Sequence, residues 1–120
     1  MNAPQTDNTN LLLTRILDAT ALRQRVLTNN LANVNTPHFH RQDLDFQDAL
    51  SHAVKQGSAA NIQLEVKEDT VSPERFDGNN VQLETELSEM SKNSLQYQTA
   101  MQVLGMRMAL QRMAVTGRSV

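Results

Sequence analysis

The sequence contains no cysteine, no tryptophan and few aromatic residues, with three Phe and one Tyr among 120 residues. The absence of cysteine excludes disulfides, thiolate catalysis and cysteine-ligated zinc sites. Aromatic side chains bury the most area per residue, and only 39% of the chain is apolar, so little material is available for a self-sufficient core. Asn and Gln are abundant, with 11 of each. The composition therefore lies near the border between globular and disordered chains.

Long apolar runs and a strong net charge are also missing. No purely apolar run is longer than that of Leu11–Leu13, whereas a bilayer-spanning helix needs ~20 such residues. The first ten residues, MNAPQTDNTN, lack the basic and apolar regions of a cleavable secretory signal, so we expect any export to use another route. A net charge of -2 gives no general reason to expect nucleic acid or an anionic membrane as a partner.

Charge is distributed unevenly along the chain. The net charge is +2 for residues 1–41, -7 for residues 42–99 and +3 for residues 100–120. This asymmetry either steers the ends of one copy toward the middle of another or reflects a solvated acidic face.

Hydrophobic periodicity predicts a first helix over residues 11–35, with Thr9 or Asn10 as its cap and Pro37 as a stop signal. Its apolar positions form a sector wider than the ~100° stripe that faces a single partner. They include Leu12, Ile16, Ala19, Val26, Leu27 and Leu31. We therefore expect this helix to contact at least two surfaces.

A second helix is predicted over residues 81–116, because apolar residues recur there with unbroken four-three spacing. The turn-forming residues Asp77–Asn80 predict a turn and a cap before this helix, and Gly117 suits its end. The spaced positions are Leu83, Leu87, Met90, Ser94, Tyr97, Met101, Leu104, Met108, Gln111 and Val115.

Residues 36–80 form a polar, turn-rich middle segment. Asp48–Lys55 has the composition of two helical turns, and Ile62, Leu64 and Val66 alternate with polar residues as in a short half-buried strand. The chain is thus predicted to be a single all-α subunit, residues 1–120. Its fold would be an elongated two-helix antiparallel coiled-coil hairpin with a small irregular or short-strand middle segment. We expect the apolar faces from Leu12 to Val34 and from Leu83 to Val115 to pair within a subunit and against neighbours, because each helix has more apolar surface than a single seam covers.

Enzyme and metal chemistry are weakly supported. His38 and His40 would share one side of an extended segment near Asp43 and Asp45, either as a surface metal site or as solvent-exposed histidines. The neighbours Ser51, His52 and Asp48 resemble a catalytic set only by short-range coincidence. The glycines are isolated, so no phosphate-binding loop is predicted. We expect no catalytic site, no cofactor and no metal.

Three further features each have two interpretations. The Met residues of the second helix fill an adaptable core or bind a metal or varied ligands. Gly105 permits close approach of another backbone or is merely tolerated. The amides of Asn29, Asn30, Asn33 and Asn35 fix the register of packed helices or mark a frayed helix end.

The segment ANVNTPHF, residues 32–39, resembles the Asn-Thr-Pro motif of the axial proteins of the bacterial flagellum. Three further segments, RQDLDF at 41–46, DGNNV at 77–81 and KNSLQYQ at 92–98, resemble the FlgB family of proximal rod proteins. The chain departs from the family at His38, where glycine is usual, at Phe39, where tyrosine is usual, and at His40, where a basic residue is usual. A side chain at residue 38 makes a positive φ less easy and puts the turn after Pro37 in doubt.

The resemblance implies a non-catalytic structural subunit of the flagellar basal body, located in the rod within the periplasmic space and exported by the flagellar type III system without a cleavable signal. It implies contacts with further copies, with the rod proteins FlgC, FlgF and FlgG, with FliE, with the MS-ring protein FliF and with the export gate. Phe39, Phe46 and the acidic middle segment would make lateral contacts.

The residues expected to take part in assembly come from both helices and from the turn between them. They are Leu12, Ile16, Ala19, Val26, Leu27, Asn30, Leu31, Asn33, Asn35, Thr36, Pro37, Phe39, Phe46, Leu83, Leu87, Met90, Ser94, Tyr97, Met101, Leu104, Met108 and Val115. Two alternative functions stay open: a soluble helical adaptor or export-chaperone-like module, which would be a stable dimer, and a metal-binding protein that uses His38 and His40.

Overall fold

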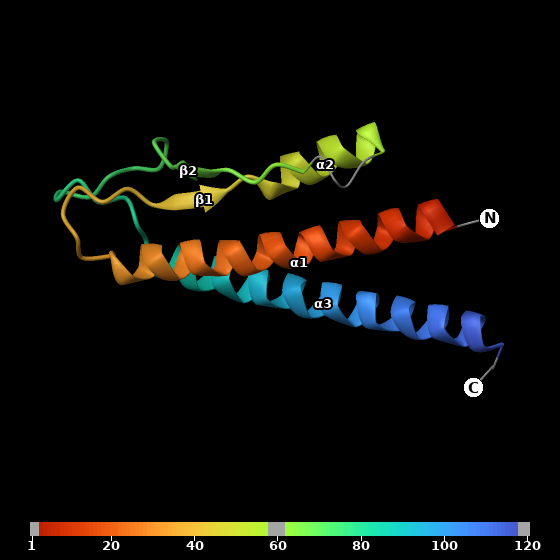
Figure 1. Ribbon diagram of the computed structural model, residues 1–120. Coiled ribbons are helices and arrows are strands. Elements are labelled where there is room, and N and C mark those ends of the chain that lie inside the picture. Colours follow the sequence, from red (N-terminus) through yellow and green to blue (C-terminus); the bar gives the residue numbers. More distant parts are fainter. Residues whose placement is uncertain (1–2, 58–61, 118–120) are drawn as a thin grey trace.

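The computed structural model describes residues 3–57 and 62–117, with side chains described from residue 8 onward. Along the chain lie α1 (Ala3–Ala32), β1 (Gln42–Leu44), α2 (Phe46–Gln56), β2 (Val66–Glu68) and α3 (Leu83–Thr116). The helices α1 and α3 pack side by side and run antiparallel, so the start of α1 and the end of α3 lie at the same end of the molecule (Figure 1). The predicted all-α helical hairpin is confirmed.

The first helix begins eight residues before the predicted start at Leu11 and ends at Ala32 rather than at residue 35. Proline is well tolerated in the first turn of a helix, so Pro4 suits the start that the structure shows. The residues between Pro4 and Leu11 are polar, and hydrophobic spacing therefore carries no signal there. After Ala32 the chain turns through Asn33–Asn35.

The middle segment folds back along α1, so that α1 lies between it and α3 (Figure 1). Ala19 and Val26 of α1 are buried, as are Leu44 of β1 and Phe46 and Ala53 of α2. The wide apolar sector of the first helix is thereby explained, because α1 contacts two surfaces as predicted. The predicted helical turns at Asp48–Lys55 are part of α2.

The short strands form an antiparallel pair in which Gln42 faces Glu68 and Leu44 faces Val66. The strand predicted for Ile62–Val66 is therefore wrong, because the structure places the strand at Val66–Glu68. Ile62 and Leu64 instead line a small hollow with Phe46 and Leu50. The alternation of apolar and polar residues over 62–66 correctly indicated that one side of this segment is covered. The position of the strand, however, is set by pairing with β1, which lies far away in the sequence.

The helix α3 begins at Leu83, and its N-cap residue Gln82 makes no side-chain capping hydrogen bond. The expectation that Asp77–Asn80 supply this cap is wrong, because Asn79 and Asn80 bond to other parts of the chain. At the other end, Gly117 adopts the left-handed conformation typical of a helix C-terminus, as predicted.

The subunit measures 64 × 30 × 14 Å and has a radius of gyration of 18.3 Å. A compact chain of this length has a radius of gyration of about 14 Å. The molecule is therefore long and thin, and much of each helix lies at its surface. Among the described residues no helix is long and apolar enough to cross a bilayer.

Candidate functional site

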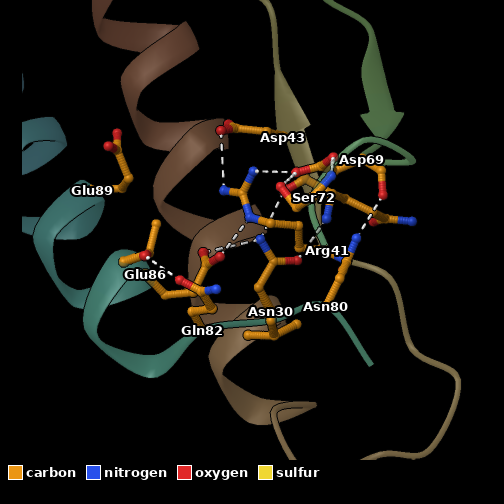
Figure 2. A network of polar contacts seen from close by, with 12 residues as sticks. Asn30, Arg41, Asp43, Asp69, Ser72, Asn80, Gln82, Glu86 and Glu89 are labelled. Atoms are coloured by element: carbon orange, nitrogen blue, oxygen red, sulfur yellow. Dashed lines mark hydrogen bonds and ion pairs between the residues drawn. The ribbon is translucent and has the colours of Figure 1, made fainter. Parts of the chain in front are cut away.

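A network of charged and amide side chains joins α1, β1 and α3 near the closed end of the hairpin, and we call it the polar junction (Figure 2). Its centre is Arg41, whose Nε donates to Glu86 Oε1 at 2.6 Å and whose other nitrogens reach Asp43 Oδ2 at 3.3 Å and Asp69 Oδ2 at 3.4 Å. Glu86 has no exposed surface. Burial opposes the charge of Arg41, but the hydrogen bond and attraction of Glu86 and the charge of Asp43 outweigh it, so the pKa of Arg41 is raised.

A second arginine, Arg23 of α1, shares Asp43 with Arg41 and also bonds a carboxylate of α3. Arg23 donates from Nε to Asp43 Oδ1 at 2.9 Å and from Nη2 to Glu89 Oε2 at 2.8 Å. Burial raises the pKa of Asp43, but the hydrogen bond from Arg23 outweighs this effect and leaves the pKa below its usual value. The hydrogen bond from Arg23 likewise lowers the pKa of Glu89. Arg23 thus bridges β1 and α3 from α1.

Asparagines complete the junction by bonding to backbone groups. Asn30 is fully buried, donates to the carbonyl of Gln42 at 2.7 Å and accepts from its N–H at 2.9 Å. Its Nδ2 also lies 3.2 Å from Glu86 Oε2. For Asn30, the interpretation that an amide fixes the register of packed elements therefore fits the structure, whereas Asn29 and Asn35 are exposed.

Two asparagines of the DGNN segment bond across the turn between the helices. Asn79 donates to the carbonyls of Asn33 at 2.9 Å and Thr36 at 2.8 Å. Asn80 accepts from the N–H of Arg41 at 2.6 Å and donates to the carbonyl of Asp69 at 2.7 Å. In the sequence, these roles are signalled only by the clustering of amides beside a glycine. That pattern favours a turn but does not show which groups the amides will bond.

The turn after Pro37 keeps a left-handed backbone although it has no glycine, because His38 has a φ of 62°. Its N–H donates to the carbonyl of Asp77 at 2.9 Å. Gly78 makes room for the imidazole, since a Cβ at that position would lie 2.5 Å from His38 Nδ1. The expected extended arrangement of His38 and His40 is therefore wrong, because the left-handed residue bends the chain.

His40 lies between two carboxylates that approach it from opposite sides. Its Nδ1 is 2.6 Å from Glu68 Oε1 and its Nε2 is 2.6 Å from Glu74 Oε1. The hydrogen bonds to Glu68 and Glu74 raise the pKa of His40. Within the described part of the chain, no group of three or more His, Asp or Glu side chains is arranged to hold a metal ion. His40 thus connects β2 to the loop that follows it, and we call its contacts with Glu68 and Glu74 the His40 clasp.

The contact between α1 and α3 contains buried polar side chains where the sequence pattern favoured an apolar seam. We call the spaced positions predicted from Leu83 to Val115 the α3 stripe. The buried residues of α3 are Glu86, Asn93 and Ala100, and each lies one position before a member of this stripe. Asn93 donates to the carbonyl of Thr20 at 2.8 Å and to Gln24 Oε1 at 2.9 Å. The expectation that this stripe pairs with α1 within the subunit is therefore wrong for most of its length, whereas its expected contacts with neighbouring subunits stay a prediction.

The predicted assembly residues divide into two groups. Those of α1 are mostly inside the subunit: Ala19, Val26, Leu27 and Asn30 are buried, and Leu12, Ile16, Leu31 and Asn33 are partly buried. Most of the α3 stripe is exposed, including Leu83, Leu87, Ser94, Tyr97, Met101, Met108 and Val115, whereas Met90 and Leu104 are partly buried. At the turn, Asn35, Thr36 and Pro37 are exposed and Phe39 is partly buried. Phe46 packs inside the subunit, so it does not offer the expected lateral contact.

A second apolar row on α3 escaped the sequence analysis. Leu95, Val103, Met106 and Leu110 are 64%, 40%, 66% and 60% exposed. We call this row the second stripe. These four residues do not follow an unbroken four-three spacing, so periodicity gives no separate signal for them beside the α3 stripe. The two stripes together leave large apolar side chains exposed along the second half of α3.

Comparison with known proteins agrees with the resemblance in the turn and in the helices. A family model described as flagella basal body rod protein matches residues 17–39, which include the end of α1 and the His38 turn. The flagellar basal body rod protein FlgB of Yersinia enterocolitica is 32% identical over 109 residues, covering 74% of this chain and 80% of the relative. The chain belongs to the FlgB family of flagellar basal body rod proteins.

Other FlgB proteins show the same degree of similarity. The FlgB of Cereibacter sphaeroides is 32% identical over 108 residues, covering 79% of this chain and 84% of the relative. The FlgB of Borrelia hermsii is 32% identical over 104 residues, covering 69% and 77%. Membership of the FlgB family makes the chain a structural subunit of the flagellar basal-body rod.

Proposed function

We propose that this rod subunit joins copies of itself and other rod proteins through the two apolar stripes of α3 and so transmits torque along the rod. The observation that carries the proposal is the exposure of large apolar side chains on both stripes in the isolated chain. Exposed apolar surface of this extent marks an interaction site. From Asn93 to Met106 the helix also carries no charged residue, which suits burial between neighbouring helices.

The polar junction supports the mechanical part of this proposal. A subunit that transmits torque must resist rotation of one helix about the other. Arg23 and Arg41 connect α1, β1 and α3 through carboxylates that are buried or half-buried. Such bonds are directional and stiffen the closed end of the hairpin, while the apolar stripes remain available for neighbours.

The partners, the route and the lack of catalysis belong to the same proposal. We infer contacts with FlgC, FlgF, FlgG, FliE, FliF and the export gate, passage through the flagellar type III system without signal cleavage, and a final position in the periplasmic part of the basal body. Membership of a family of rod proteins and the exposed stripes of α3 support this inference. The protein is proposed to have no catalytic activity.

The test places a charge on the stripe at a position that the free subunit leaves exposed. Met101 is 51% exposed, so Met101→Asp should leave the isolated fold intact and place an unpaired charge in the assembled interface. We expect motility and incorporation into purified basal bodies to be lost in a strain that produces only this variant. Met101→Leu keeps the apolar contact and should restore both. Normal motility with Met101→Asp would contradict the proposal, and a stable soluble dimer that stays outside the basal body would favour an adaptor.

A further inference from the structure

The loop of residues 68–74 is fastened at both of its ends to a single imidazole. His40 Nδ1 lies 2.6 Å from Glu68 Oε1, and its Nε2 lies 2.6 Å from Glu74 Oε1. Glu68 is the last residue of β2, and Glu74 follows at the far end of the loop. The side chains of these glutamates are 55% and 54% exposed, so either carboxylate can leave the imidazole and become fully hydrated.

The charges around His40 favour its protonated form. Among the described residues its ion pairs are with Glu68 of β2 and Glu74 of the loop, and none is with α1 or α3. The charged residues next to these three in the sequence have other partners: Arg41 with Glu86, Lys67 with Glu65, Asp69 with Arg41 and Arg75 with Asp77. The hydrogen bonds to Glu68 and Glu74 raise the pKa of His40, and this brings the loss of its charge toward neutral pH.

Loss of the proton leaves the imidazole able to hold only one of the two glutamates. A neutral imidazole has one N–H and one nitrogen lone pair, and a lone pair that faces a carboxylate oxygen at 2.6 Å repels it. The backbone of Glu68 is held in the strand pair opposite Gln42, whereas Glu74 belongs to no helix or strand. Glu74 is therefore the partner that leaves, and the remaining N–H stays with Glu68.

The first part of the loop is fixed by a carboxylate that does not depend on His40. Asp69 accepts from the N–H groups of Val71 and Ser72, both at 2.9 Å, and from the hydroxyl of Ser72 at 2.6 Å (Figure 2). These bonds lower the pKa of Asp69 to about 2, with the hydroxyl of Ser72 as the largest cause. Asp69 is therefore ionised in neutral and alkaline solution, and Val71 and Ser72 stay in place when His40 loses its proton.

Beyond Glu74 the chain is fixed again at Arg75. The N–H of Arg75 donates to the carbonyl of Asn79 at 2.7 Å, and its guanidinium donates to the carbonyl of Val81. Neither bond involves a group that titrates near neutral pH. The segment free to respond to His40 therefore consists of Pro73 and Glu74, while the rest of the loop keeps its place.

Pro73 forms part of the wall of a polar hollow at the polar junction. The hollow has a volume of about 370 Å³ and is also lined by Arg41 and Glu86. We propose that His40 is a pH-sensitive switch that holds Glu74 when protonated and releases it when neutral, so that Pro73 is freed from this wall as pH rises. Water then reaches Arg41 and Glu86 more readily, and the closed end of the hairpin becomes less rigid. The inference goes beyond the proposed function, because it concerns control of the polar junction and not the apolar stripes that join subunits.

Carbon-detected NMR of the full-length protein tests the switch, because carbon signals remain visible in alkaline solution. The imidazole of His40 and the backbone carbons of the loop are followed from about pH 5 to about pH 9. We expect the signals of Pro73 and Glu74 to shift along the titration curve of His40. The signals of Val71 and Ser72 should stay constant. Constant signals of Pro73 and Glu74 while His40 titrates, or equal changes at all four loop residues, would overturn the inference.

The variant Glu74→Gln should keep the loop closed at every pH. Its amide oxygen accepts from the imidazolium and its amide N–H donates to the neutral ring nitrogen, so either form of His40 has a partner. The response of Pro73 should therefore disappear, and the titration midpoint of His40 should fall because one carboxylate has been removed. The matched control is Glu65→Gln, which removes an exposed carboxylate that pairs with Lys67 and should leave both observations unchanged. Loss of the response in both variants, or in neither, would contradict the switch.

Discussion

At the level of single residues, Arg41 connects distant parts of the chain because it bonds to four other side chains at once. Its Nε donates to a carboxylate that is completely buried, that of Glu86. Its backbone N–H donates to Asn80. Removing one partner of a buried ion pair leaves the other charge unpaired in the interior, which destabilises a protein far more than replacing both partners by apolar residues. Glu86 therefore needs Arg41 to be tolerated in its buried position.

Replacing Arg41 with Met should therefore lower the free energy of unfolding by about 3–5 kcal/mol, because Glu86 is left buried without its cation. Urea unfolding followed by circular dichroism measures the loss. The matched control is Arg25→Met, which removes an arginine at an exposed position of the same region and should change stability by less than ~0.5 kcal/mol. Equal effects of the two substitutions would show that the buried pair is not needed.

His40 should make stability depend on pH near neutrality. A neutral imidazole has one N–H, so it cannot donate to both Glu68 and Glu74, whereas the imidazolium donates to both. The pKa of His40 is raised by these carboxylates, and the stabilisation is therefore complete below about pH 6.5 and is lost as pH rises through the raised pKa. Urea midpoints measured from slightly acidic to alkaline pH should fall in the native protein. The midpoints should stay level across the same range in His40→Arg, which remains charged. If the midpoints of the two proteins change with pH in parallel, His40 does not cause the pH dependence.

Asp69 contributes stability of the opposite pH dependence. Hydrogen bonds from the hydroxyl and the N–H of Ser72, with smaller help from Val71 and Arg41, lower its pKa to about 2. A depressed pKa stabilises the fold above the ordinary value near 3.8 and ceases to do so as pH falls through about 2. The junction and the clasp are thus both fully formed in mildly acidic solution.

At the level of elements, the contact of α1 with α3 is decided by polar residues. Asn93 is buried and gives both of its amide hydrogens to α1. A polar group in such a position allows only the register that satisfies it, since every other register leaves it unpaired. The hairpin therefore has one alignment even though its apolar residues would accept several.

Asn93→Asp should destabilise the hairpin by about 2–3 kcal/mol, because a carboxylate would face the acceptors of Thr20 and Gln24. The control Ser91→Asp adds the same charge at an exposed position of α3 and should change stability by less than ~0.5 kcal/mol. Thermal unfolding of the two variants at low protein concentration makes the comparison. If both variants unfold at the same temperature, Asn93 does not determine the register.

At the level of the whole molecule, the thin shape and the stripes of α3 imply that the isolated chain is incomplete. The second stripe exposes Met106 and Leu110 by 66% and 60%. Neighbouring subunits in an assembly would bury these side chains, which the single subunit cannot do because α1 packs against only one side of α3 (Figure 1). Association and helix order should therefore rise together.

The purified protein should accordingly form larger species and gain helicity as its concentration increases, because buried apolar area favours both. The double variant Met106→Gln with Leu110→Gln removes apolar surface that contacts little within the subunit. It should remain monomeric at concentrations at which the native chain associates. Sedimentation and circular dichroism over a concentration series measure both effects, and identical behaviour of the two proteins would exclude the second stripe as an interface.

The sequence by itself determined the two long helices, the wide apolar face of α1, the end of α3 at Gly117 and the family. Helix periodicity and the Asn-Thr-Pro turn depend on residues that are close together in the chain, so the sequence alone shows them. Only the tertiary structure decided which face of α3 meets α1, where the short strand lies and how Arg41, Asn80 and Glu86 come together. These features depend on hydrogen-bond partners that lie far apart in the chain, such as Asn93 with Thr20. Periodicity predicts which residues are buried, but it does not predict which polar groups form hydrogen bonds with one another.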